Sequence, residues 1–158
     1  MDSEVKLYLQ RAQNELNLAR IIMLISKNSK IQTETFKLLD IDTYFSAVIS
    51  HSYYAIFYSA KAYLTNKNIK IFAPEEHKKT LEQFERLVEI GAVDKELLKI
   101  YKEVLVKAEE LLGIFHIEKN KRERFTYQRV AQANEEPARN SIENAETFFK
   151  NIWNLCEK

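Results

Sequence analysis

Glycine and proline are scarce along this chain, which limits the folds open to it. Two glycines, Gly91 and Gly113, and two prolines, Pro74 and Pro137, occur in 158 residues. Folds rich in strands need many tight turns, and glycine and proline supply much of the turn geometry. The shortage therefore favours long helices joined by few connections.

Apolar residues recur at steps of three and four, which predicts amphipathic helices. The stripes are Val5, Leu9, Ala12, Leu16, Ala19 and Met23 in a helix that ends near residue 26; Leu97, Tyr101, Val104, Ala108, Leu111 and Phe115 in a later one; and Ala138, Ile142, Ala145, Phe149, Ile152 and Cys156 in the last. Residues 43–65 are apolar nearly all round and predict a central helix, with a stripe of Tyr44, Val48, His51, Ala55, Tyr58 and Ala62.

Capping residues predict where these helices begin and end. Asp40 or Asp42 is placed to cap the helix over 43–65. Asp94 is placed to cap the later helix that begins just before Leu97. Pro74 suits the first turn of a shorter helix over 75–90, which Gly91 would end. Residues 27–40 lose the helical period and predict a connection with one short turn.

These elements predict an all-α fold, an antiparallel helical bundle of four long helices plus one shorter helix. A chain of 158 residues can form one substantial core, whereas two cores would each be marginal. We therefore expect residues 1–158 to form a single domain.

Charge and composition exclude several classes of protein. The net charge of +1 gives no global field toward nucleic acid or a membrane, so any such site must be local. No apolar run approaches the roughly 20 residues that span a bilayer, and residues 1–20 look like a charged helix rather than a signal peptide. We expect a cytoplasmic protein without a membrane partner. The single cysteine, Cys156, excludes an internal disulfide and predicts a small buried side chain.

The segment from residue 118 to residue 129 has a net charge of +3 in this balanced chain. Guanidinium groups match phosphate oxygens, and aromatic rings between them can stack on bases. The candidate residues for binding RNA or a nucleotide are Lys121, Arg122, Arg124, Phe125, Tyr127 and Arg129. A solvated basic loop whose aromatic rings anchor it to the bundle is the structural alternative, which composition favours.

Metal and cofactor chemistry find no support in the sequence. No pair of histidines at helical spacing and no aspartate-rich loop occurs, so we predict no metal. Glycine-rich phosphate loops are also absent, so we predict no cofactor.

The histidines and the clustered tyrosines have structural explanations. His51 suits a hydrogen-bonded core or interface position, His77 a place at the start of a helix, and His116 the negative end of a helix dipole. The tyrosines at positions 53, 54, 58 and 63 fit core packing or a dimer surface better than ligand stacking.

Four pieces of the chain, in order, resemble the HEPN superfamily, in particular its uncharacterised 0332-type members. They are HSYYAIFYSAKAYL, HKKTLEQF, KRERFTY and SIENAETFFKNIW, and the resemblance spans roughly residues 44–155. It implies a helical homodimer and a nucleotidyltransferase antitoxin as partner. It also implies a metal-independent endoribonuclease toxin in which arginine stabilises the phosphate and histidine moves the proton.

This chain departs from the family's ribonuclease motif, in which a histidine follows the arginine after four to six residues. Tyr127 occupies that place relative to Arg122, and no histidine follows His116. If the protein is an enzyme, the resemblance gives Arg122, Arg124 and Tyr127 the catalytic roles: the arginines would hold the phosphate, and Tyr127 would orient or stack. Because an ordinary phenol has a pKa of about 10, another group must then accept the proton.

Two functions therefore stay open. The first is an HEPN-like RNA- or nucleotide-binding protein that acts as the ribonuclease toxin of a toxin–antitoxin pair. The alternative is a non-catalytic binding or scaffold partner of a nucleotidyltransferase, which the missing histidine favours. Modification of Tyr127 by that partner is a third, weaker hypothesis.

Overall fold

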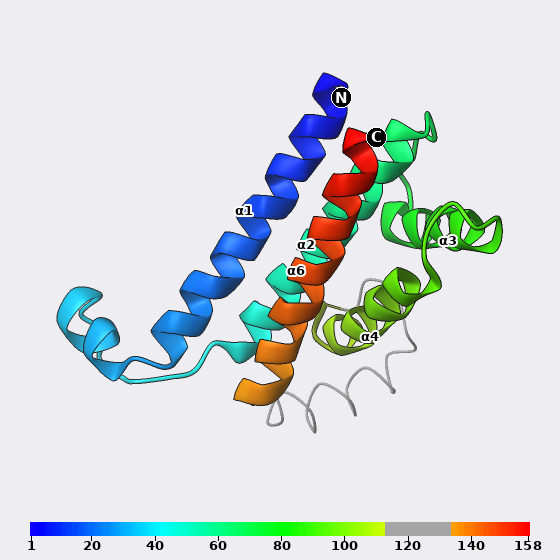
Figure 1. Cartoon of the computed structure of the whole chain (residues 1–158). Coiled ribbons are helices and arrows are strands. Elements are labelled where there is room, and N and C mark those ends of the chain that lie inside the picture. The colour runs from blue at the N-terminus through cyan, green and yellow to red at the C-terminus, as the bar shows by residue number, and fades with distance from the viewer. Residues whose placement is uncertain (113–133) are drawn as a thin grey trace.

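The computed structural model describes residues 1–112 and 134–158, and all regular structure in these residues is helical (Figure 1). The all-α prediction is confirmed: these two ranges contain four long helices and one shorter helix, with one π-helical turn between the first two. The elements are α1 (Ser3–Ser26), η1 (Ile31–Thr35), α2 (Phe45–Asn66), α3 (Glu76–Glu89), α4 (Lys95–Leu112) and α6 (Glu135–Glu157). None of the helices in these ranges is long and apolar enough to cross a membrane.

Helices α1 and α2 are antiparallel neighbours, as short connections between long helices predict. The hydroxyl of Ser26, at the end of α1, accepts a hydrogen bond of 2.8 Å from the backbone N–H of Tyr44, just before α2. Near the start of α1, the Tyr8 ring stacks on Tyr58 in the second half of α2, with 6.4 Å between centroids. The two helices therefore face each other along most of their length.

Helix α6 also runs antiparallel to α1. Lys27, just after α1, pairs with Glu135 in the first turn of α6 at 2.7 Å, and Arg20 pairs with Glu146 further along at 2.7 Å. It follows that α2 and α6 run in the same direction, although they are far apart in the sequence. Figure 1 shows α1, α2 and α6 along the length of the bundle, with α3 and α4 to one side.

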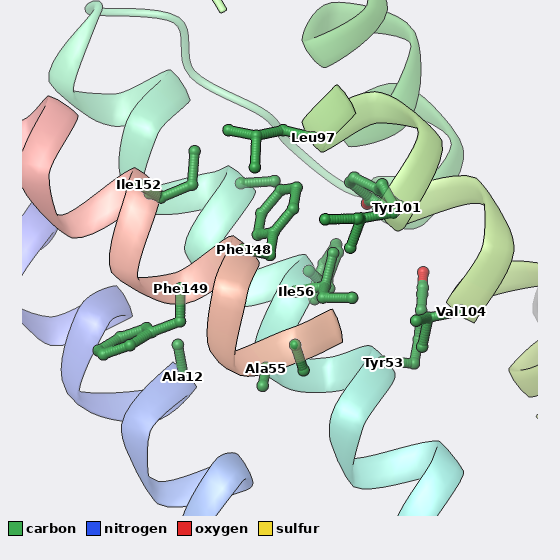
Figure 2. Close-up of a cluster of buried hydrophobic side chains, with 14 of the residues drawn as sticks. Ala12, Tyr53, Ala55, Ile56, Leu97, Tyr101, Val104, Phe148, Phe149 and Ile152 are labelled. Carbon is green, nitrogen blue, oxygen red and sulfur yellow. The ribbon is translucent and has the colours of Figure 1, made fainter. Parts of the chain in front are cut away.

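The core forms around α2, which packs against α1, α3, α4 and α6. Figure 2 shows side chains from α1, α2, α4 and α6 meeting in one cluster. Phe148 of α6 is fully buried there, with its ring 5.4 Å from Phe84 and edge-to-face with Tyr101 at 5.8 Å. Such edge-to-face aromatic pairs add to the stabilisation from burial alone.

The predicted stripes of α1 and α6 are confirmed. All six predicted residues of α6 are buried, as are five of the six in α1, and Met23 packs partly buried against the core. In α4, Leu97, Tyr101, Val104 and Ala108 are buried. Phe115 lies outside the described residues. Burial raises the pKa of the Cys156 thiol to about 11, in keeping with its predicted place in the core.

Two of the predicted capping assignments are wrong. The N-cap of α2 is Tyr44, without a side-chain cap, because Asp42 instead accepts a hydrogen bond from the adjacent Thr43 N–H at 2.7 Å. Pro74 does not enter the first turn of α3, because Glu75 adopts a left-handed conformation (φ 61°) and separates it from the helix.

The other two capping assignments are confirmed. Gly91 follows α3 with a positive φ of 74°, and its N–H donates to the Val88 carbonyl at 2.9 Å. That conformation favours glycine. The Asp94 carboxylate accepts from the Glu96 N–H at 2.9 Å and so caps α4.

A buried glutamine holds the connection between α1 and α2 in place. Gln32, on η1, is fully buried, and its amide donates to the carbonyls of Ile25 at 2.9 Å and Asp42 at 2.8 Å. Its side-chain oxygen accepts from the Asp42 N–H at 3.0 Å. The backbone groups of Ile25 and Asp42 therefore have a side-chain hydrogen-bond partner in place of water.

The aromatic core gives a direct test of the fold. Phe148→Ala should lower the free energy of unfolding by about 3–5 kcal/mol, because it removes a fully buried ring and leaves a cavity. The matched control is Phe72→Ala, whose ring is 68% exposed and which should cost under about 1 kcal/mol. Urea denaturation followed by circular dichroism measures both; similar losses would contradict the assigned core.

Candidate functional site

The binding and catalytic residues predicted from the sequence lie outside the described residues. They are Lys121, Arg122, Arg124, Phe125, Tyr127 and Arg129, and His116 also lies there. The structure does describe where α6 begins. Lys27, at the end of α1, pairs there with Glu135. The chain therefore enters α6 at the end of the bundle where α1 ends and α2 begins.

Within the described residues, polar and aromatic side chains gather on one edge of α2. Its positions follow steps of three and four, so they share one face of the helix. Side chains of α1 lie against them. We call this surface the α1/α2 seam, and it consists of Tyr8, Arg11 and Glu15 from α1 with His51, Tyr54, Tyr58 and Lys61 from α2.

Three partly exposed tyrosine rings form the middle of the seam. Tyr58 stacks on Tyr8 with 6.4 Å between centroids and 17° between planes. It also stacks on Tyr54, at 6.3 Å and 29°. Tyr58 thus joins the two helices through its ring. The three rings present polarisable faces and edges at the surface.

Two cations flank these rings. The guanidinium carbon of exposed Arg11 lies 5.6 Å from the centroid of Tyr58, and Nζ of Lys61 lies 4.8 Å from the centroid of Tyr8. Both distances are within the range of cation–π attraction. The seam therefore combines aromatic faces with positive charge.

Lys61 is buried for a lysine, with 10% of its side chain exposed. Its Nζ donates to Oε2 of Glu76 at 2.8 Å, which links α2 to the first turn of α3. Desolvation lowers the pKa of Lys61, but its hydrogen bonds, that with Glu76 first among them, raise it by more. The net shift is upward, so Lys61 keeps its charge beside the tyrosines.

At the other end of the seam, His51 pairs with a carboxylate. Its Nδ1 lies 2.6 Å from Oε2 of Glu15, and the side chains are 31% and 22% exposed respectively. The sequence-based expectation of a hydrogen bond is met. Of the two positions expected for His51, the exposed fraction excludes the buried core, and the interface position stays a prediction. Since α2 is apolar nearly all round, its period could not show which edge faces out.

The second described histidine, His77, has a structural environment. Its Nδ1 shares a hydrogen bond of 2.9 Å with the hydroxyl of Tyr53, and its ring stacks on Phe57 with 4.0 Å between centroids. Burial lowers the pKa of His77. This side chain joins α3 to α2, and its burial favours the neutral form of the ring.

The tyrosine cluster divides into two parts. Tyr53 and Tyr63 are buried, as the core-packing expectation has it, and burial raises the pKa of Tyr53 well above its ordinary range. Tyr54 and Tyr58 stay partly exposed on the seam. The sequence could have predicted this face, because polar or amphipathic residues recur at positions 51, 54, 58 and 61, in steps of three and four.

No three His, Cys, Asp or Glu side chains within residues 1–112 and 134–158 gather closely enough to hold a metal ion. Comparisons with protein-family models, curated proteins and solved structures found no match to this chain. The chemistry of the seam is therefore argued from its own residues.

The environment of His77 predicts a pH dependence of stability. Because its folded-state pKa is lowered, the unfolded chain binds a proton more readily as the pH falls through about 6.5. The stability that neutral His77 supports is thus present above this pH and is lost below it. When the pH is lowered from about 7.5 to about 5.5, the free energy of unfolding of wild type should fall by more than that of His77→Phe. The difference between the two losses should be under about 1 kcal/mol, because solvent screens the half-buried ring.

Urea denaturation at both pH values measures this difference. Lys78→Gln, an exposed change next in the chain, serves as the control and should follow wild type. Parallel behaviour of wild type and His77→Phe would show that His77 is not held neutral.

Proposed function

We propose that this protein is an HEPN-like protein that binds RNA or a nucleotide. The observation that supports this most is the α1/α2 seam, where three stacked tyrosines lie beside two cations. Proteins that bind single-stranded nucleic acid combine aromatic rings, on which bases stack, with positive charges that follow the backbone. The seam offers both on one surface.

The sequence adds a second group of suitable residues. The segment 118–129 carries a local charge of +3 and two aromatic residues, Phe125 and Tyr127. It precedes α6, which begins at the end of the bundle where α2 also begins. The arginine forks of this segment would contact phosphate, and its aromatic rings would contact bases.

The activity that the HEPN resemblance implies is metal-independent RNA cleavage by the toxin of a toxin–antitoxin pair. In this proposal Arg122 and Arg124 hold the phosphate, and Tyr127 orients or stacks. The protein acts as a homodimer with a nucleotidyltransferase as antitoxin partner, and no cofactor takes part.

The rival proposal is a non-catalytic partner of a nucleotidyltransferase. One specific observation favours it: no histidine follows His116 in the sequence, so the family's arginine–histidine motif is incomplete. A binding module needs no proton acceptor. The two proposals share the bundle and differ in whether RNA is cleaved.

Binding is tested first on the seam. Tyr58→Leu and Arg11→Ala should each weaken binding of a single-stranded RNA about fivefold or more, since stacking of a base is worth about 1–3 kcal/mol. Fluorescence anisotropy at fixed salt measures the affinity. Arg139→Ala, which removes a half-exposed arginine from α6, is the control and should bind as wild type does.

Cleavage is tested on the same RNA in EDTA, with the dimer checked by light scattering. Arg122→Ala, Arg124→Ala and Tyr127→Ala should abolish cleavage if the protein is a ribonuclease. Binding without cleavage by wild type would favour the non-catalytic partner. Unchanged binding in both seam variants would remove the main support for an RNA site here.

A further inference from the structure

The pair of Glu15 and His51 has the geometry of an oriented general base. An ionised carboxylate accepts hydrogen bonds but cannot donate them, so Nδ1 of His51 is the donor when it pairs with ionised Glu15 at 2.6 Å. In the neutral ring this leaves the lone pair on Nε2. A carboxylate that fixes the tautomer and orientation of a histidine is the arrangement found in hydrolase triads.

The pair is accessible and rigidly held. About a third of the His51 side chain is exposed (31%), which leaves a reactant a way to the ring. Both residues are on long helices that pack along the seam, with Glu15 in the middle of α1 and His51 in the second turn of α2. Helical positions fix side chains better than loops do.

A phosphate-binding cation lies one helical turn away. Arg11 precedes Glu15 by four residues on α1, which places it ~6 Å further along the same face. Its guanidinium lies over the ring of Tyr58, two turns along α2 from His51. A nucleotide bound along the exposed edge of the Tyr58 ring would therefore place its phosphate near Arg11 and His51.

We propose that His51, oriented by Glu15, is the proton acceptor for RNA cleavage on the seam. Nε2 of His51 takes the proton of a ribose 2′-hydroxyl, and the 2′-oxygen forms a bond to the adjacent phosphorus. The bond from phosphorus to the 5′-oxygen breaks, water protonates the leaving 5′-oxygen, and histidine returns its proton to solvent. The products are a 2′,3′-cyclic phosphate and a 5′-hydroxyl, and no metal or redox partner is needed.

His77 is a poorer candidate for this role. Its Nδ1 is bonded to a tyrosine hydroxyl rather than to a carboxylate, and its ring stacks on Phe57 and Tyr53. The inference about His51 names a proton acceptor among the described residues, and it rests on the proposed RNA function.

The test uses the full-length protein and a random-sequence single-stranded RNA pool in EDTA. His51→Gln should lower kcat by about 100-fold or more, as loss of a general base does, with RNA affinity within about threefold of wild type. Glu15→Gln should lower kcat at least about tenfold by releasing the ring. Glu103→Gln, an exposed change on α4, is the matched control and should cleave normally.

Chemical rescue separates a catalytic role from a structural one. Added imidazole should restore part of the cleavage by His51→Ala and none of that lost in Arg122→Ala. Cleavage by wild type with unchanged kcat in His51→Gln would overturn the acceptor while leaving the ribonuclease proposal intact. RNA binding without cleavage by wild type would overturn both the acceptor and the ribonuclease activity, and absence of binding would overturn the RNA function itself.

Discussion

The structure depends on the burial of α2 by four other helices. Because α1, α3, α4 and α6 all pack on it, its apolar residues point in almost every direction and most of them are covered. Few large polar or aromatic side chains of α2 remain partly exposed, and His51, Tyr54 and Tyr58 lie on the edge that α1 also lines. The candidate site is therefore a consequence of how the core is filled, and its side chains are held by the same helices that form the core.

Aromatic rings connect this core to the surface. Tyr53 is fully buried, lies edge-to-face with Tyr101 at 6.4 Å and is bonded through its hydroxyl to His77. One residue later, Tyr54 turns outward and stacks on Tyr58. Neighbouring residues on one helix point in different directions, so one tyrosine stabilises the bundle and the next lies on the seam. The proposed RNA contacts use the second group and leave the first in place.

The sequence predicted the helices well because apolar spacing and capping chemistry are local. Two capping assignments failed because the local backbone conformation differs from the expected one: Asp42 bonds its neighbour instead of capping α2, and a left-handed Glu75 separates α3 from Pro74. The seam was missed because tertiary contacts decide it. Glu15 and His51 are 36 residues apart, and their pairing follows from the antiparallel register of α1 and α2, which spacing alone does not give. The predicted arginine and tyrosine sites lie outside the described residues.

The most direct test of the central claim is photo-crosslinking of a 4-thiouridine-containing single-stranded RNA to the full-length protein, with the modified residues mapped by mass spectrometry. The account predicts crosslinks on the tyrosines of the α1/α2 seam, Tyr8, Tyr54 and Tyr58, and their loss when an excess of unlabelled RNA competes. Crosslinks confined to exposed rings elsewhere, such as Phe72 beyond the end of α2, would contradict the assignment of this surface as the RNA-binding site.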